Sequence, residues 1–415
     1  MATNRPREGE PASHAPQEGG PGGKEAVRHL DQRANHLLHR DTVPVPLSGR
    51  ELHRHTAILA MTRYGKSYFA GRIIEELLRK GATILTIDAH GDYANMTQTP
   101  DGHLHPEFHD KITVYRPEAA EHFEAPHARP LQLSVSRCSV PELLALARIT
   151  GSLQSIMLRT AIRKAKADNP VYTLDDIIDK LEEDMPEKAD GKERVARIVM
   201  RLQDLRRRGI FTDGDTDVRN FFRPQHMSDI FLSGMTDYVQ DVVVGMLLRR
   251  VWDAKFRKEP WARAPIFIFI EEAHRFAAPP DEGGGKFSRN ILARIAAEGA
   301  KFGVFLTVIS QRPRRLDPDI LANCSNLAIL RIVNSQDQRT IQAASESFSE
   351  DLLGDLPALE QGEAILVGPY VPVPVMIRTA SRETMHGGRT PDISGLLAEA
   401  LERARAEKED KELLY

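Results

Sequence analysis

Two adjacent carboxylates, Glu271 and Glu272, follow the uninterrupted apolar run Ile266–Ile270. A wholly apolar strand is typical of a parallel sheet that is covered on both faces, and ligands of such sheets bind at the carboxyl ends of the strands. Hydrolysis of a metal-bound phosphate needs one acid near Mg²⁺ and one that orients or deprotonates water. We assign Glu271 to the metal and Glu272 to the water. The alternative is a solvated strand end.

The second chemical feature is the octet Ala-Met-Thr-Arg-Tyr-Gly-Lys-Ser at 60–67, between an apolar segment and a helical pattern. Strand, loop and helix in this order form a phosphate-binding loop, whose backbone N–H groups cradle an anion. Lys66 is predicted to reach the terminal phosphates of ATP, and the Ser67 hydroxyl to bind Mg²⁺. The expected nucleotide contacts within this stretch are Thr62, Arg63, Tyr64, Gly65, Lys66, Ser67 and Tyr68. The alternative is a basic helix start after a strand.

Polar residues also follow two other apolar strands. Gln311 comes after 304–309, where its amide can hydrogen-bond the attacking water or the γ-phosphate. With Lys66 and Glu272 it completes the predicted catalytic set. Asp92 follows the apolar strand 83–88 and is a candidate for the surroundings of Mg²⁺. The alternatives are strand-end capping for Gln311 and a plain turn for Asp92.

The elements that must position these residues alternate between strand and helix. Strand 56–59, a helix over 66–80 that ends at Gly81, and strand 83–88 form a βαβ unit with a right-handed crossover. Further strands are predicted at 228–232, 266–270, 304–309 and 327–332, helices near 238–256 and 287–300, and a terminal hairpin at 364–367 and 373–377. The predicted fold class is α/β, with a mainly parallel sheet flanked by helices.

Domain limits follow from where this alternation stops. Residues 1–24 are rich in Pro, Gly, Glu and Ala and are predicted to be a disordered tail. Residues 138–222 are mostly amphipathic helix and are interpreted as an inserted helical subdomain. The core is thereby divided into 25–137 and 223–385, and a charged C-terminal helix and tail occupies 386–415.

Composition limits the function classes. Lys and Arg number 56 against 59 Asp and Glu, which excludes a chain that coats nucleic acid simply by being basic but allows a local basic channel. The two cysteines, Cys138 and Cys324, match no zinc or redox spacing. No apolar run approaches the roughly 18 residues of a membrane span, and the N-terminus has no apolar signal core. We expect a cytoplasmic protein that makes no membrane contact.

The blocks, in their order along the chain, resemble the HerA branch of the FtsK–HerA ATPases. The resemblance covers about residues 45–385 and rests on the segments 54–59, 87–93, 271–274, 298–303, 310–318 and 362–368. It implies a RecA-like P-loop domain that assembles as a hexameric ring around duplex DNA and uses ATP hydrolysis to translocate it, often beside a nuclease. It also implies that Arg54 contacts the nucleotide and that an arginine of a neighbouring subunit completes each site.

Three departures from the family pattern stand out. Ala60, Arg63 and Tyr64 replace three small residues of the phosphate loop, and a positive φ at Ala60 would cost roughly 1 kcal/mol or more. Ala300 stands where the family often has an arginine, so Arg312, Arg314, Arg315 or Arg331 is expected to act in trans. About 45 residues precede the motor, fewer than the N-terminal β-barrel typical of HerA needs, which suggests a form without a barrel.

Within the helical insertion, four arginines fall on one helical face at a period of 3.6 residues: Arg194, Arg197, Arg201 and Arg208. A pore helix that touches DNA phosphates has this pattern. An ordinary solvated helix has it too.

The leading hypothesis is therefore an ATP-driven DNA translocase or helicase that acts with a nuclease or other effector. The alternative is a nucleotide-gated ring scaffold that assembles and regulates an effector enzyme, for example in phage defence, with little translocation. A third reading, a monomeric phosphotransferase, is disfavoured by the block around Gln311 and by the lack of a recognisable acceptor-site motif.

Overall fold

The computed structural model describes residues 44–47, 51–117, 128–212, 214–279, 286–345 and 348–387, together with 395, 397, 398 and 400–403. The chain divides into two units, Met1–Pro46 and Leu47–Tyr415, and every element below belongs to the second. The predicted disordered tail, 1–24, lies outside the described residues, as does most of the predicted C-terminal segment 386–415.

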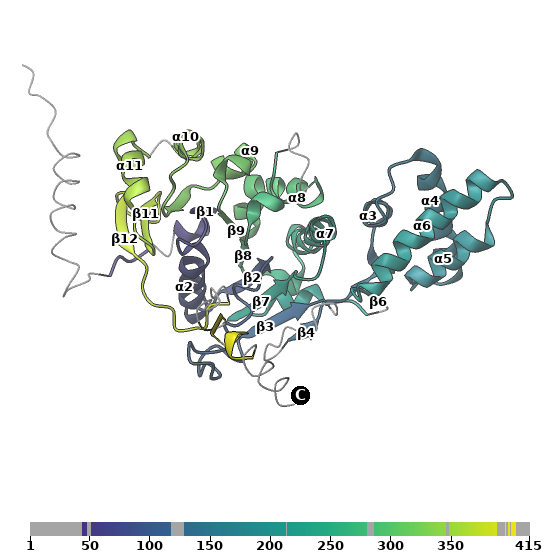
Figure 1. Cartoon of the computed structure of the whole chain (residues 1–415), viewed down its shortest axis with the longest axis horizontal. Helices are drawn as coiled ribbons and strands as arrows, with labels where there is room; N and C mark the ends of the chain where they lie inside the picture. The colour runs from purple at the N-terminus through teal and green to yellow at the C-terminus, as the bar shows by residue number, and fades with distance from the viewer. Residues whose placement is uncertain are drawn as a thin grey trace, which may run out of the picture. The chain divides into compact units, whose positions relative to one another are not determined.

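Ten described strands form one sheet in the order β12-β11-β10-β1-β9-β8-β2-β7-β3-β4 (Figure 1). Their bounds are β1 Thr56–Leu59, β2 Thr83–Asp88, β3 Ile112–Arg116, β4 Arg129–Pro130, β7 His226–Phe231, β8 Ile266–Ile270, β9 Val304–Ser310, β10 Asn326–Ile329, β11 Glu363–Val367 and β12 Val375–Arg378. The β10–β11 and β11–β12 pairs are antiparallel, and the other neighbouring pairs are parallel. The prediction of a mainly parallel α/β sheet with a terminal hairpin is confirmed.

Alternate residues of the central strands enter two separate cores. Ile58 of β1 and Ile84 of β2 pack with Phe69 and Ile74 of α2 (Lys66–Arg79) on one face of the sheet. Their neighbours Leu59 and Leu85 point to the other face, into the core that contains residues of α7 (Asp237–Phe256) and α8 (Lys286–Glu298). Helices therefore cover both faces, which explains why β8 is an unbroken apolar run.

The segment 138–222 contains α3 (Val140–Leu146), α4 (Ser152–Asp168), α5 (Leu174–Glu183) and α6 (Ala189–Arg207). Helices α4, α5 and α6 pack on one another (Figure 1). Before and after these helices, β5 (Leu133–Ser134) and β6 (Phe211–Thr212) pair as a separate two-stranded sheet. The helical content matches the prediction, while the interpretation as an inserted subdomain stays a prediction.

Several boundaries differ from those expected. Strand β10 ends at Ile329, before Arg331, and β7 begins at His226, two residues before the expected strand. Strand β3 and the short strands β4, β5 and β6 were not predicted from the sequence. The shorter helices in the second half are α9 (Pro318–Ala322), α10 (Ser335–Ala344) and α11 (Glu350–Asp355).

Candidate functional site

The phosphate loop connects the end of β1 to the first turn of α2. Gly65 has φ 95° and ψ 16° and forms the N-cap of α2, a left-handed conformation that glycine adopts without steric cost. Arg63 also has a positive φ, 69°, whereas Ala60 is not among the described residues with positive φ. Ala60 therefore carries no strain from a positive φ, and the backbone strain of the loop falls on Arg63.

Lys66 lies between the two acids that follow β8. Its Nζ is 2.5 Å from Glu271 Oε1 and 2.9 Å from Glu272 Oε1. All three residues are buried, with Glu271 fully enclosed. Glu272 has φ 50° and ψ 44°, so the backbone turns out of the strand at this residue and directs the two carboxylates to one cationic partner. The predicted meeting of the phosphate loop with the paired acids is therefore present in the fold.

The Ser67 hydroxyl lies in the same cluster. It is 2.9 Å from Glu271 Oε1 and 3.0 Å from Asp92 Oδ2, and the Tyr93 hydroxyl donates to Glu271 Oε2 at 2.7 Å. The loop that carries Asp92 and Tyr93 is held by Asp88, which accepts hydrogen bonds from the backbone N–H groups of residues 90–93. Asp92 and Tyr93 of this loop thus contact Ser67 and Glu271, and the contact of Tyr93 was not predicted from the sequence.

Burial sets the electrostatics of the cluster. Desolvation raises the pKa of Glu271 to about 7, against the opposing effect of the Lys66 ammonium. Burial alone would lower the pKa of Lys66, but the Glu271 and Glu272 carboxylates raise it above its ordinary value. One lysine therefore neutralises only part of the charge of two buried carboxylates. A further cation bound beside them would stabilise their charged forms.

His274 lies beside Glu272. His274 Nδ1 is 3.2 Å from Glu272 Oε2 and 3.3 Å from the Ser310 hydroxyl. The pKa of His274 is lowered to about 4, chiefly by desolvation, with smaller effects from Arg312 and Arg315 and an opposing effect from the Glu272 carboxylate. His274 is neutral near pH 7 and does not neutralise Glu272. This contact was also missed, because His274 follows the strand in a short 3₁₀ turn, η6 (Ala273–Arg275), that no periodicity predicts.

Gln311 reaches the phosphate loop because of the strand order. Strand β9 lies between β1 and β8, so its carboxyl end opens between the loop and the paired acids. The Thr62 hydroxyl donates a hydrogen bond to Gln311 Oε1. Gln311 is thereby adjacent to the loop, and its catalytic role stays a prediction.

Other predicted nucleotide contacts lie apart from this cluster. Arg54 precedes β1, at the opposite end of that strand from the phosphate loop, and pairs with Glu51 at 2.7 Å. The Tyr68 hydroxyl accepts a hydrogen bond from the backbone N–H of Arg382 at 2.7 Å. The structure does not bring Arg54 to the loop of its own chain, and it directs Tyr68 to the segment after β12.

The candidate trans arginines differ in their surroundings. The Arg331 guanidinium lies over the Tyr64 ring, 5.1 Å from its centroid, within the same chain. Arg314 donates to Gln336 at 2.8 Å, whereas Arg312 is exposed after β9 and Arg315 is half-buried. These positions do not single out an arginine that acts in trans.

The basic face predicted on α6 is partly engaged within the chain. Arg194 pairs with Asp190 at 2.7 Å, and Arg197 pairs with Glu193. The Arg201 guanidinium donates to the backbone carbonyls of Ala147 and Arg148 at 3.2 and 2.5 Å. Arg208 is half-buried at the C-cap. Arg201 thus connects α6 to the end of α3. This contact stabilises the fold and is a role other than DNA binding.

Comparisons with known proteins show the family of this chain. The family model described as Helicase HerA, central domain, matches residues 34–251. A probable helicase of Methanocaldococcus jannaschii is 32% identical, over 86% of this chain and 68% of its own length. The chain belongs to the HerA helicase family. The DNA double-strand break repair helicase HerA of Pyrococcus furiosus is 29% identical, over 85% of this chain and 70% of its own.

Two solved structures share the fold of this HerA-family chain. VirB4 of Thermoanaerobacter pseudethanolicus has a TM-score of 0.57 at 13% identity, over 83% of this chain and 98% of its own. The plasmid coupling protein TrwB, solved with ADP and Mg²⁺, has a TM-score of 0.56 at 14% identity, over 87% of this chain and 93% of its own. No described helix is long and apolar enough to cross a membrane.

The residues present fit a magnesium-bound nucleotide. Ser67, Glu271 and Asp92 offer the oxygen ligands that Mg²⁺ prefers, and Glu272 Oε2 is buried without a hydrogen-bond partner. Within the described residues no group of three or more His, Cys, Asp or Glu could hold a metal alone. That result is expected for Mg²⁺, which takes most of its ligands from phosphates and water.

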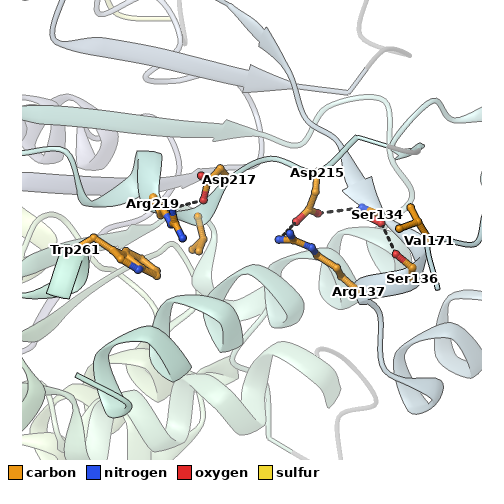
Figure 2. A pocket seen from close by; sticks show the side chains of 9 residues that line it. Ser134, Ser136, Arg137, Val171, Asp215, Asp217, Arg219 and Trp261 are labelled. Atoms are coloured by element: carbon orange, nitrogen blue, oxygen red, sulfur yellow. Dashed lines mark hydrogen bonds and ion pairs between the residues drawn. The ribbon is translucent and has the colours of Figure 1, made fainter. Parts of the chain in front are cut away.

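A separate hollow of about 610 Å³ lies near the amino ends of β7 and β8, where η4 (Val218–Phe222) and η5 (Pro260–Ala262) precede these strands. Figure 2 shows Arg137 beside Asp215, and Arg219 near Trp261. Asp215 accepts from Arg137 and Arg250, each at 2.9 Å. None of the predicted site residues lines this hollow, and its two arginines are matched by two aspartates. It carries no net charge that would select a phosphate.

Proposed function

We propose that this chain hydrolyses ATP with Mg²⁺ and uses the energy to translocate duplex DNA as a ring of six copies. The observation that supports it best is the buried cluster of Lys66, Ser67, Glu271 and Glu272 at the carboxyl ends of β1 and β8. The family supports it too, since relatives are named as DNA double-strand break repair helicases. The similar TrwB structures, solved with ADP and Mg²⁺ and with an ATP analogue, support the choice of nucleotide.

In this proposal Ser67 and Glu271 hold Mg²⁺, with Asp92 beside them. Bound Mg²⁺ would neutralise charge on the phosphate oxygens. Lys66 exchanges its carboxylate partners for the terminal phosphates, because the backbone N–H groups of the loop and the helix start attract the same anion. The Tyr93 hydroxyl keeps Glu271 oriented through its 2.7 Å hydrogen bond.

Glu272 orients and deprotonates the attacking water in this proposal. Its Oε2 is buried and accepts no hydrogen bond, although His274 Nδ1 lies 3.2 Å away, so it retains an acceptor site for that water. Gln311 lies beside Thr62 of the loop, where its amide can contact the γ-phosphate or the water. An arginine of the neighbouring copy, chosen from Arg312, Arg315 and Arg331, completes the site, and a nuclease or other effector acts on the translocated DNA.

DNA-stimulated ATP hydrolysis tests the proposal. We expect the wild-type chain to hydrolyse ATP faster with duplex DNA, and Glu272→Gln to lose about 10²-fold or more of that rate while still binding nucleotide. Lys66→Ala is the control that lacks the phosphate contact. Hydrolysis by the wild type that does not exceed Lys66→Ala, with DNA and effector present, would overturn the proposal.

The phosphate loop favours a second candidate function, a ring scaffold that binds nucleotide and assembles an effector enzyme with little translocation. Arg63 holds a left-handed conformation, and Tyr64 packs against Arg331, so this loop is bulkier than the family pattern. Glu272→Gln separates the two functions. Full effector assembly and full biological activity in this variant would favour the scaffold.

A further inference from the structure

The chain after β12 returns to the nucleotide site along α2. We call residues 379–387 the C-terminal strap. It begins where Thr379 N–H donates to Gly362 O at 2.8 Å, and Gly362 N–H in turn donates to Tyr64 O of the phosphate loop at 3.4 Å. It ends where Gly387 N–H donates to Asp92 O at 3.3 Å. Figure 1 shows the chain leaving β12 and passing beside α2.

The centre of the strap holds a buried arginine. Arg382 is 5% exposed, and its guanidinium lies against Gly71 of α2, where an added Cβ would be 2.5 Å from Arg382 Cζ. Nη2 donates to Thr384 Oγ1 and Met385 O, both at 3.1 Å, and Nη1 lies 3.1 Å from His386 Nδ1. The planar guanidinium therefore fixes the path of residues 382–386, a geometry that a lysine ammonium would not reproduce.

The strap has further attachments to α2 besides this guanidinium, whose Nε lies 4.0 Å from Glu75 Oε1. Glu75 Oε1 accepts from the backbone N–H groups of Glu383 and Thr384 at 3.0 and 2.9 Å. Arg79 also pairs with Glu383 at 2.5 Å. Removing the Arg382 guanidinium should therefore loosen the end of the strap without detaching it from α2.

The residues that contact Arg382 or follow it in the strap lie next to Ser67 at one end and to Asp92 at the other. Tyr68, whose hydroxyl accepts from Arg382 N–H and whose ring lies 5.7 Å from Arg382 Cζ, follows Ser67 directly in α2. Gly387 contacts the loop of Asp92 so closely that an added Cβ would lie 1.9 Å from Gly91 O. Asp92 and Ser67 are themselves in contact at 3.0 Å.

We propose that Arg382 is a positioning residue for the Mg²⁺–nucleotide site: through the strap it holds the Asp92 loop against Ser67. This inference rests on the proposed function, since it assumes that ADP and Mg²⁺ bind at Ser67. Residues that orient metal ligands from outside typically contribute about 10- to 100-fold to metal affinity. The strap is thus expected to set how much Mg²⁺ strengthens nucleotide binding.

The test is calorimetric binding of ADP to the full chain, once with Mg²⁺ and once with EDTA. We expect Arg382→Met to lose about 10-fold or more of the affinity gain that Mg²⁺ gives the wild type, with less than about a two-fold change in EDTA. Arg79→Met is the matched control, because it removes a contact between strap and α2 outside the Arg382 network, and it should keep the full gain. Arg382→Lys should restore only part of it.

Gly387→Ala disturbs the other end of the strap, where it contacts the Asp92 loop. This variant tests the inference if Arg382→Met does not fold. We expect it to reduce the Mg²⁺-dependent gain as well. Equal gains in the wild type, Arg382→Met and Gly387→Ala would overturn the inference, as would equal losses with and without Mg²⁺. A wild-type chain that binds no ADP in either condition would instead overturn the proposed function.

Discussion

At the scale of single residues, the site depends on Glu271. Its carboxylate contacts Lys66, Ser67 and Tyr93 while it is fully buried. A buried carboxylate is tolerated only when its lone pairs are satisfied, and these three donors come from α2 and from the loop after β2. Glu272, one residue later, keeps one oxygen without a hydrogen bond. The two adjacent acids are therefore suited to different tasks by their partners.

Arg63 provides a prediction at this scale. Its φ of 69° is one that glycine adopts freely and that costs an ordinary L-residue about 1 kcal/mol. Arg63→Gly and Arg63→Ala remove the same charged side chain, but only the glycine relieves the backbone. We expect Arg63→Gly to be more stable than Arg63→Ala by about 1 kcal/mol in reversible denaturation, and to bind ADP more tightly. Equal stability of the two variants would show that the loop is not strained at Arg63.

At the scale of elements, the order of the strands assembles the site. Strand β9 lies between β1 and β8, and β2 lies on the far side of β8. In a parallel sheet the carboxyl ends of all these strands meet at one edge. Gln311, the paired acids and Asp92 therefore converge on the phosphate loop, although 25 to 249 residues separate the contacting partners along the chain. The helices α2, α7 and α8 keep this edge fixed by covering both faces.

Helix α6 separates a structural arginine from candidate DNA contacts. Arg201 donates to two carbonyls at the end of α3, whereas the Arg197 side chain is 62% exposed beside Glu193. We expect Arg201→Ala to lower the free energy of unfolding by about 1.5 kcal/mol, because the carbonyls lose charged donors. Arg197→Ala should change it by less than about 0.5 kcal/mol.

If α6 contacts DNA phosphates, Arg197→Ala should also weaken binding to duplex DNA of any sequence. The slope of the logarithm of the binding constant against the logarithm of the salt concentration should fall by about one. A salt series of binding measurements provides the check. Unchanged binding in Arg197→Ala would indicate that this part of α6 is an ordinary solvated surface.

At the scale of the whole molecule, buried histidines tie stability to pH. Burial lowers the pKa of His55 and of His226 to about 4, below the usual 6.5. His55 Nδ1 accepts from Leu306 N–H at 2.9 Å in β9, a contact that requires the neutral ring. Between pH 6.5 and 4 the unfolded chain binds protons at these residues and the folded chain does not. Stability is therefore fully present above pH 6.5 and is lost as the pH falls.

We expect each of these histidines to contribute up to about 1.4 kcal/mol of lost stability per pH unit in that window. His55→Gln should flatten the dependence by that amount between pH 6.5 and 5 in chemical denaturation. His103→Gln changes an exposed histidine and should leave the slope unaltered. Parallel slopes for the wild type and His55→Gln would contradict a neutral, buried His55 in the fold.

The amino-acid sequence alone was enough to predict most of the central strands and helices and to select the residues of the candidate site. The octet 60–67, the apolar run before Glu271 and the polar residue after strand 304–309 are local signals, since apolar periodicity and loop composition depend on neighbours in the chain. These signals were sufficient for the α/β class and for the meeting of Lys66 with the paired acids. They also identified the family, because several such blocks occur in a fixed order.

Which side chains share the site could not be predicted from local sequence, because it depends on how distant segments pack. That Tyr93 reaches Glu271, that His274 lies beside Glu272, and that Arg54 stays at the far end of β1 depend on strand order and register. The placement of Arg382 depends on room left by Gly71, a helix glycine with no local signature. These contacts are set by burial between segments far apart in the chain, where packing rather than local preference selects the partner.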